Sequence, residues 1–136
     1  MPCCLRNSSV FRQRAYESCQ VSVWLVGEGG WRAAAPGEQT IRLLFDEPQR
    51  LRRIHVRFEE RERARAHEFA LGWSPDPAAP PREIVRQQYS FDPQGATVEE
   101  ESYDVDLAGV AVLQLRIRPD TAGSDALASL ARLRLA

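Results

Sequence analysis

The chain has 136 residues, a length that fits one domain and leaves little room for two. Its apolar share of 43% and charged share of 27% are those of a globular protein, which excludes a chain disordered throughout. The net charge is only −1, which argues against broad electrostatic attraction to nucleic acid, although all 18 basic residues are arginine.

The three cysteines, Cys3, Cys4 and Cys19, all lie near the start of the chain and form no zinc-binding spacing. An odd number of cysteines predicts no disulfide framework, and free thiols are typical of a reducing compartment. We find no apolar leader after Met1 and no apolar run that could span a bilayer. We therefore expect a cytoplasmic protein without a membrane span.

Residues 1–19 are polar and weakly patterned, so we expect an N-terminal arm, or an edge strand near residues 8–11. From residue 20 to residue 136 the chain divides into short segments in which apolar and polar residues alternate, the pattern of half-buried strands. In chain order these predicted strands are 20–26, 40–45, 51–58, 67–73, 83–91, 102–107, 110–117 and 129–135.

Turn-forming residues separate the predicted strands. Residues 33–37 are expected to form a link, residues 46–49 a turn that contains Pro48, and residues 126–128 a single helical turn. Residues 59–69 are good helix formers, but they lack an apolar stripe, which favours a charged reversal followed by a strand. About eight strands at spacings of roughly 10 to 15 residues predict an all-β domain, an antiparallel sandwich.

Residues 30–45, with the sequence GWRAAAPGEQTIRLLF, carry a resemblance to a known family. The segment resembles the early part of galactose-binding-like domains, the jelly-roll group that includes discoidin or coagulation factor 5/8 type C modules. HEFALGWSPD at residues 67–76 and VAVLQLRIRPD at residues 110–120 are similar to later parts of that pattern. Residues 30–41 are also similar to a segment of the N-terminal domain of the eukaryotic single-strand-break repair scaffold. The resemblance implies a jelly-roll sandwich with a ligand at the loops of one end.

We expect Trp31 and Trp73 to be buried in the core, with Trp31 beside Ile41 and Phe45, and leave the role of Trp24 open between packing and stacking on a ligand. His55 and His67 are predicted to be surface residues rather than catalytic bases. No nucleotide-binding, zinc-protease or serine-hydrolase motif occurs in the sequence. We therefore predict a protein that is not an enzyme and holds no cofactor.

Acidic residues cluster at Glu99, Glu100 and Glu101 and again at Asp104 and Asp106. We expect a solvated loop and strand face rather than a paired-acid glycosidase or a calcium site. Six arginines fall on the outward rows of predicted strands, where they form either a basic stripe or cross-strand ion pairs. These are Arg53, Arg57, Arg116, Arg118, Arg132 and Arg134.

The predicted function is a non-catalytic binding module for a carbohydrate or a related polyol. The alternative is a protein–protein interaction or homo-oligomerisation module, and nucleic-acid binding is a weaker third hypothesis. The candidate loops are 27–36, 74–82 and 119–125, and no metal ligands are assigned. The candidate ligand-binding residues on or beside these loops are Trp24, Glu28, Arg32, Asp76, Arg82 and Asp120.

Overall fold

The structure is a computed structural model that describes the backbone of residues 8–13 and the backbone and side chains of residues 31–136. The described residues contain strands and connecting loops and no helix, so the all-β prediction is confirmed. The strands are β1 (Ser8–Gln13), β2 (Trp31–Pro36), β3 (Gln39–Glu59), β4 (Arg65–Ser74), β5 (Arg82–Phe91), β6 (Val98–Arg118), β7 (Leu127–Leu130) and β8 (Arg132–Leu135).

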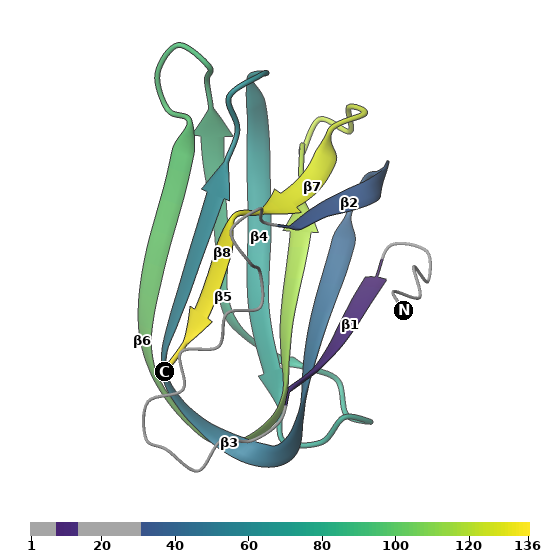
Figure 1. Ribbon diagram of the computed structural model, residues 1–136, viewed down its shortest axis with the longest axis vertical. Coiled ribbons are helices and arrows are strands. Elements are labelled where there is room, and N and C mark those ends of the chain that lie inside the picture. The colour runs from purple at the N-terminus through teal and green to yellow at the C-terminus, as the bar shows by residue number, and fades with distance from the viewer. Residues whose placement is uncertain (1–7, 14–30) are drawn as a thin grey trace.

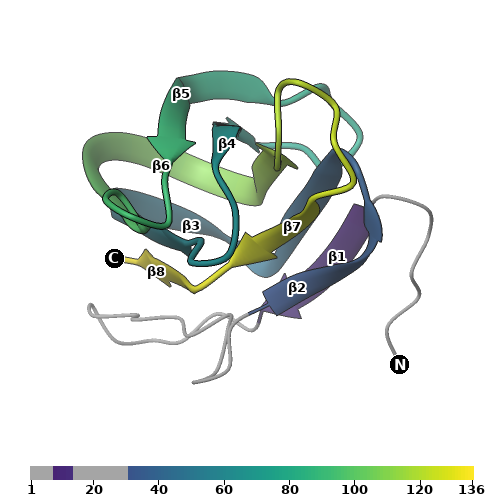
Figure 2. The ribbon, with the colours of Figure 1, turned by 90° about the horizontal axis from the view of Figure 1, so that it is seen from above.

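Two long, bent strands organise the domain. Figure 1 shows β3 turning through a U, and β6 follows it as its antiparallel partner. The first part of β3 pairs in parallel with β1 on one side and with the second part of β6 on the other. That part of β6 also pairs with β4, and β4 pairs with β5. The second part of β3 pairs with the first part of β6 and with β8. The same two strands therefore contribute to both layers of a sandwich-like arrangement (Figure 2).

The bends lie where the β3–β6 ladder is irregular, between Leu44 and Arg53 on β3. On β6 the bend contains Gly109, whose φ of +72° is in the left-handed region that favours glycine. We expected separate strands at 40–45 and 51–58 and at 102–107 and 110–117. Those divisions are wrong, because the strands bend at these points and continue to pair with each other.

Gly109→Ala is expected to lower the free energy of unfolding by about 1–2 kcal/mol, since a Cβ atom is unfavourable at a left-handed φ. Gly95→Ala is the matched control, because Gly95 has no positive φ and a Cβ atom there would meet nothing within 4 Å. Thermal or urea unfolding of the two variants checks this, and equal stability would contradict the role given to the bend.

Three further sequence predictions differ from the structure. Residues 31–36 form β2 instead of a link, because this segment pairs with β7 far along the chain. The expected helical turn at 126–128 is wrong, because Ala128 lies within β7, and the predicted strand 129–135 is divided between β7 and β8. For residues 59–69 the favoured prediction, a charged reversal followed by a strand, is confirmed, since β4 begins at Arg65. The predicted strand 20–26 lies outside the described residues.

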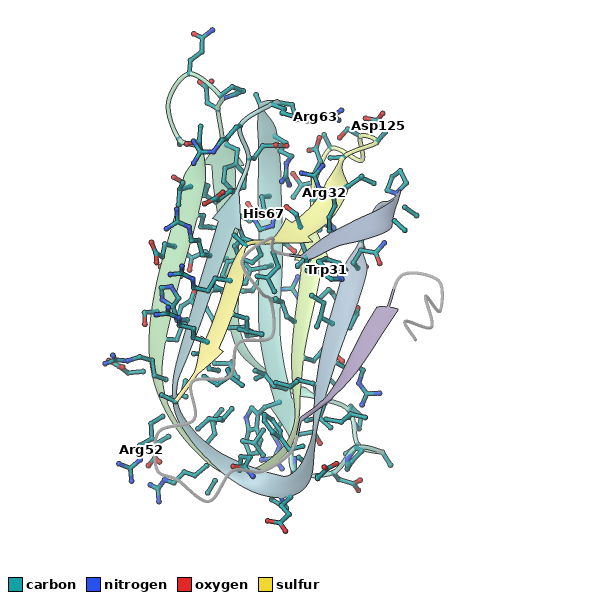
Figure 3. The ribbon with its side chains drawn as sticks, viewed as in Figure 1. Trp31, Arg32, Arg52, Arg63, His67 and Asp125 are labelled. Carbon is teal, nitrogen blue, oxygen red and sulfur yellow. The ribbon has the colours of Figure 1, made fainter. Side chains whose placement is uncertain are left out.

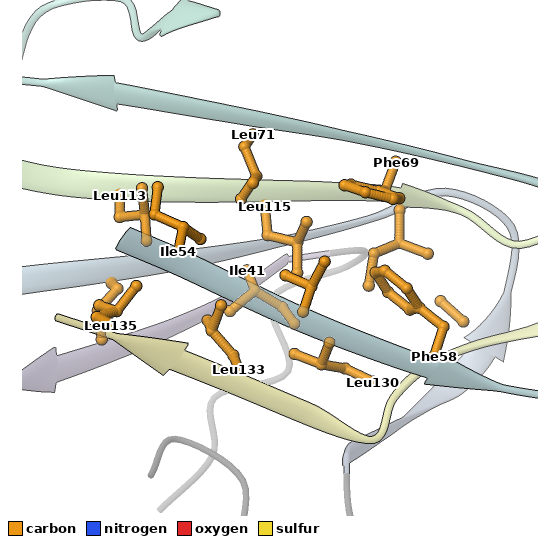
Figure 4. Packing of buried hydrophobic residues seen from close by; sticks show 14 of the residues in the cluster. Ile41, Ile54, Phe58, Phe69, Leu71, Leu113, Leu115, Leu130, Leu133 and Leu135 are labelled. Carbon is orange, nitrogen blue, oxygen red and sulfur yellow. The ribbon is translucent and has the colours of Figure 1, made fainter. Parts of the chain in front are cut away.

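The core lies between the two layers and consists of the inward rows of the strands (Figure 4). Ile54, Val56 and Phe58 of β3 face Phe69 and Leu71 of β4, and all five side chains are fully buried. Leucines of β6, β7 and β8 belong to the same cluster. Trp31 and Trp73 are only half-buried and pack against the edge of this core, so their predicted full burial is wrong.

Candidate functional site

A polar hollow of about 330 Å³ lies at the end of the domain opposite the U of β3. It is formed by β2, by the turn between β3 and β4, and by the loop that leads into β7. Figure 3 shows Arg32, Arg63 and Asp125 gathered at this end. The residues that line the hollow are Arg32, Pro36, Glu60, Glu62, Arg63, Arg65, Asp125, Ala126, Leu127 and Ser129.

Two ion pairs fix the walls of the hollow. Arg63 Nη1 lies 2.7 Å from Asp125 Oδ1, which joins the β3–β4 turn to the loop before β7. The Arg63 guanidinium holds the pKa of the Asp125 carboxyl below its usual value. Arg65 Nε lies 2.8 Å from Glu60 Oε1. The Arg65 side chain is 3% exposed and also donates to the carbonyl of Pro119, so it ties three segments together.

Arg32 and Glu62 are the two charged residues of the hollow that make no side-chain ion pair or hydrogen bond with another residue of 31–136. Both are exposed. The lining holds three arginines and three carboxylates and is therefore balanced in charge. The Arg32 guanidinium, a planar group of hydrogen-bond donors, and the Glu62 carboxylate, an acceptor, are thus available to a ligand. The other charges of the hollow already neutralise one another.

A buried His–Glu pair lies inward of the hollow. On the inward row of β4, His67 follows Arg65, and its Nδ1 lies 3.2 Å from Glu99 Oε1 of β6. Both side chains are at most 1% exposed, and the rings of Phe58 and Phe91 lie 4.5 and 5.5 Å from the His67 ring. Burial lowers the pKa of His67, and the hydrogen bond to Glu99 only partly opposes this effect. Among the side chains and backbone of residues 31–136, His67 Nε2 and Glu99 Oε2 find no hydrogen-bond partner.

Two sequence predictions fail at this pair. His67 was expected at the surface and Glu99 on a solvated face, but both are buried. The alternating pattern of β4 could have predicted that His67 is buried, because residue 67 falls on the same row as Phe69 and Leu71. His55 is one-fifth exposed and pairs with Glu100 at 2.9 Å on the outward side of β3.

The structure separates the predicted ligand-binding residues. Arg32 lines the hollow, and Asp120 lies in the neighbouring loop, where it accepts the amide N–H of Ala122. A hydrogen bond with Ser124 and that amide bond hold the pKa of Asp120 below its usual value. Asp76 and Arg82 lie at the other end of β4, which spans ten residues and therefore about 30 Å. Trp24 and Glu28 lie outside the described residues.

Asp76 and Arg82 both make contacts within the chain. The Asp76 carboxylate accepts the amide N–H of Ala78 and so stabilises the proline-rich loop after β4. The Arg82 guanidinium lies 5.4 Å from the centre of the Trp73 ring. Arg42 donates to the carbonyl of Pro77 and holds the same loop against the sheet. The loop 75–81 thus lies at the opposite end of the domain from the hollow.

Three of the six outward arginines form ion pairs with acidic residues, as the second interpretation of the arginine pattern predicted for the group. Arg53 lies 3.1 Å from Asp104, Arg57 lies 3.4 Å from Glu100, and Arg116 lies 3.7 Å from Glu38. Arg50 pairs with Asp106 at 2.6 Å. In the described part of the chain, no group of three or more acidic, histidine or cysteine side chains could hold a metal ion.

A scan against protein-family models and a search of curated proteins both find no match to this sequence. Within residues 8–13 and 31–136, no helix has the length and apolar character needed to cross a membrane.

Proposed function

We propose that this protein is a non-catalytic binding module and that the hollow beside β2 takes a neutral, hydroxyl-rich ligand, a carbohydrate or a related polyol. The observation that carries the proposal is the charge-balanced lining, in which Arg32 and Glu62 remain available. The volume of about 330 Å³ suits one sugar ring or a short polyol, since small-molecule sites range from about 300 to 1,000 Å³.

The charge balance favours a neutral ligand over an anionic one. Arg63 and Arg65 already face carboxylates at 2.7 and 2.8 Å, so a phosphate would have to compete with Asp125 and Glu60 for them. A sugar hydroxyl both donates and accepts hydrogen bonds, and it can meet the Arg32 guanidinium and the Glu62 carboxylate together. Nucleic acid is therefore the weaker candidate partner.

The proposal includes the finer assignment of the fold. We propose a jelly roll of the galactose-binding-like type, on the resemblance of residues 30–45, and a cytoplasmic location, on the cysteine pattern. A binding site at the loops of one end is what that resemblance implies, and the hollow lies at one end of the domain.

Arg32→Ala is expected to weaken binding of a glycan by about tenfold to a hundredfold, since a hydrogen bond to a charged group contributes about 1.5–3 kcal/mol. A glycan array identifies the ligand, and calorimetry measures its affinity for the parent and the variant. Arg82→Ala is the control, because it removes an exposed arginine at the other end of the domain.

The control is expected to bind as tightly as the parent. Two outcomes would contradict the proposal: no glycan binds at millimolar concentration, or a glycan binds and Arg82→Ala, rather than Arg32→Ala, loses affinity.

A further inference from the structure

The outer edge of β5 is unpaired in the described part of the chain. β5 is the last strand in the order β1-β3-β6-β4-β5, and nine of its ten residues are paired, all of them with β4. Such an edge presents a row of backbone N–H and C=O groups that can bind another strand. Figure 2 shows β5 on the outside of the molecule.

A second free edge in the same domain carries more charged residues than β5, and all of them have the same sign. The first part of β6, residues 98–107, pairs only with β3 and carries five acidic residues and no basic one. β5 carries Arg82, Glu83 and Arg86, and it has no proline or lysine, the residues that commonly block strand addition. Arg86 and Glu83 neutralise each other at 2.9 Å.

The inward row of β5 leaves apolar surface at this edge. Val85 and Tyr89 lie on this row, opposite Leu71 and His67 of β4, and both side chains are only partly buried. The Tyr89 hydroxyl donates to the carbonyl of Val98, which holds the ring at the open side of the sandwich. A strand added to β5 would cover the exposed parts of both side chains.

We propose that β5 is a dimerisation edge and that its partner is the β5 strand of a second copy of this chain, in antiparallel orientation. In a continuous sheet, residues that lie opposite each other on neighbouring strands have their side chains on the same face, and this limits the possible registers. Centred on Gln87, the pairing places Val85 opposite Tyr89 of the second copy and Arg86 opposite Gln88. No like charges meet in this register, whereas a register centred on Arg86 would bring two arginines together.

The test is sedimentation velocity of the full chain from low micromolar to millimolar concentration. The parent is expected to shift from monomer to dimer and to stop there, because a two-fold pairing uses the same edge on both copies. Amide hydrogen exchange over residues 82–91 is expected to slow as the dimer forms. A parent that stays monomeric throughout, or that grows beyond a dimer, would overturn the proposal.

Gln88→Arg is the variant that tests the register. The substitution places a cation opposite Arg86 of the second copy at two symmetric positions, and it is expected to raise the dissociation constant of the dimer about tenfold. Gln88 is exposed and donates to Glu68 at 2.7 Å, a contact that an arginine can also make. Ser102→Arg, an exposed site on β6, is the control and is expected to leave the dimer unchanged. A dimer that Gln88→Arg does not weaken while both variants melt like the parent would contradict this pairing.

Discussion

Phe58→Ala is expected to lower the free energy of unfolding by about 3–5 kcal/mol, the usual cost of truncating a buried aromatic side chain. Phe58 is 1% exposed, and its ring lies 4.5 Å from the ring of His67 and 4.9 Å from that of Phe69. The substitution therefore opens a cavity between the two layers and removes an aromatic ring that packs against the buried His67–Glu99 pair. Urea unfolding of the parent and the variant measures the loss.

Trp31→Ala provides the comparison for this effect. Trp31 is larger than Phe58, but it is half-buried at the edge of the core, so its truncation is expected to cost roughly 1–2 kcal/mol. If Trp31→Ala proves the more damaging of the two, the centre of the core lies nearer β2 than the structure places it.

The protein is expected to lose stability as the pH falls below about 6.5, the ordinary pKa of histidine in an unfolded chain. Burial lowers the pKa of His67 in the folded protein, so in this range the unfolded chain binds a proton that the folded protein does not. The stabilisation is fully present above pH 6.5 and is lost as the pH falls toward the lowered folded pKa. The slope can reach about 1.4 kcal/mol per pH unit.

Chemical unfolding between pH 5 and pH 7 measures this slope, because the unfolded carboxylates titrate mainly below about pH 5. His67→Gln keeps a hydrogen-bond donor beside Glu99 and is expected to abolish the slope. His55→Gln, which alters the more exposed histidine, is expected to retain it. A parent whose stability is flat between pH 5 and pH 6.5 would show that His67 is not held neutral in the core.

The sequence was sufficient to predict the all-β class and the positions of most strands, because the alternation of apolar and polar residues marks half-buried strands. It was not sufficient for β2, since residues 33–37 look like a turn-rich link, and residues 31–36 become a strand only through pairing with β7. It also failed at the bends of β3 and β6. The residues at 46–49 are those of an ordinary turn, and only long-range pairing shows that the strand continues.

The candidate site could be predicted only in part. Arg32 is a candidate because it lies in the predicted loop 27–36, but its neighbours in the hollow come mainly from residues 60–65 and 125–129. Nothing in the sequence spacing brings these three segments together. For the same reason, Asp76 and Arg82 were grouped with Arg32, although the direction of β4 places them at the other end of the domain.

The central claim is that the hollow beside β2 is the ligand site, and an amide NMR titration with a glycan that binds tests it most directly. We expect the largest shifts at Arg32, Glu62 and Ser129, which line the hollow, and little change at Asp76 and Arg82. Shifts confined to residues 74–82, with none around Arg32, would contradict the claim and place the site at the opposite end of β4.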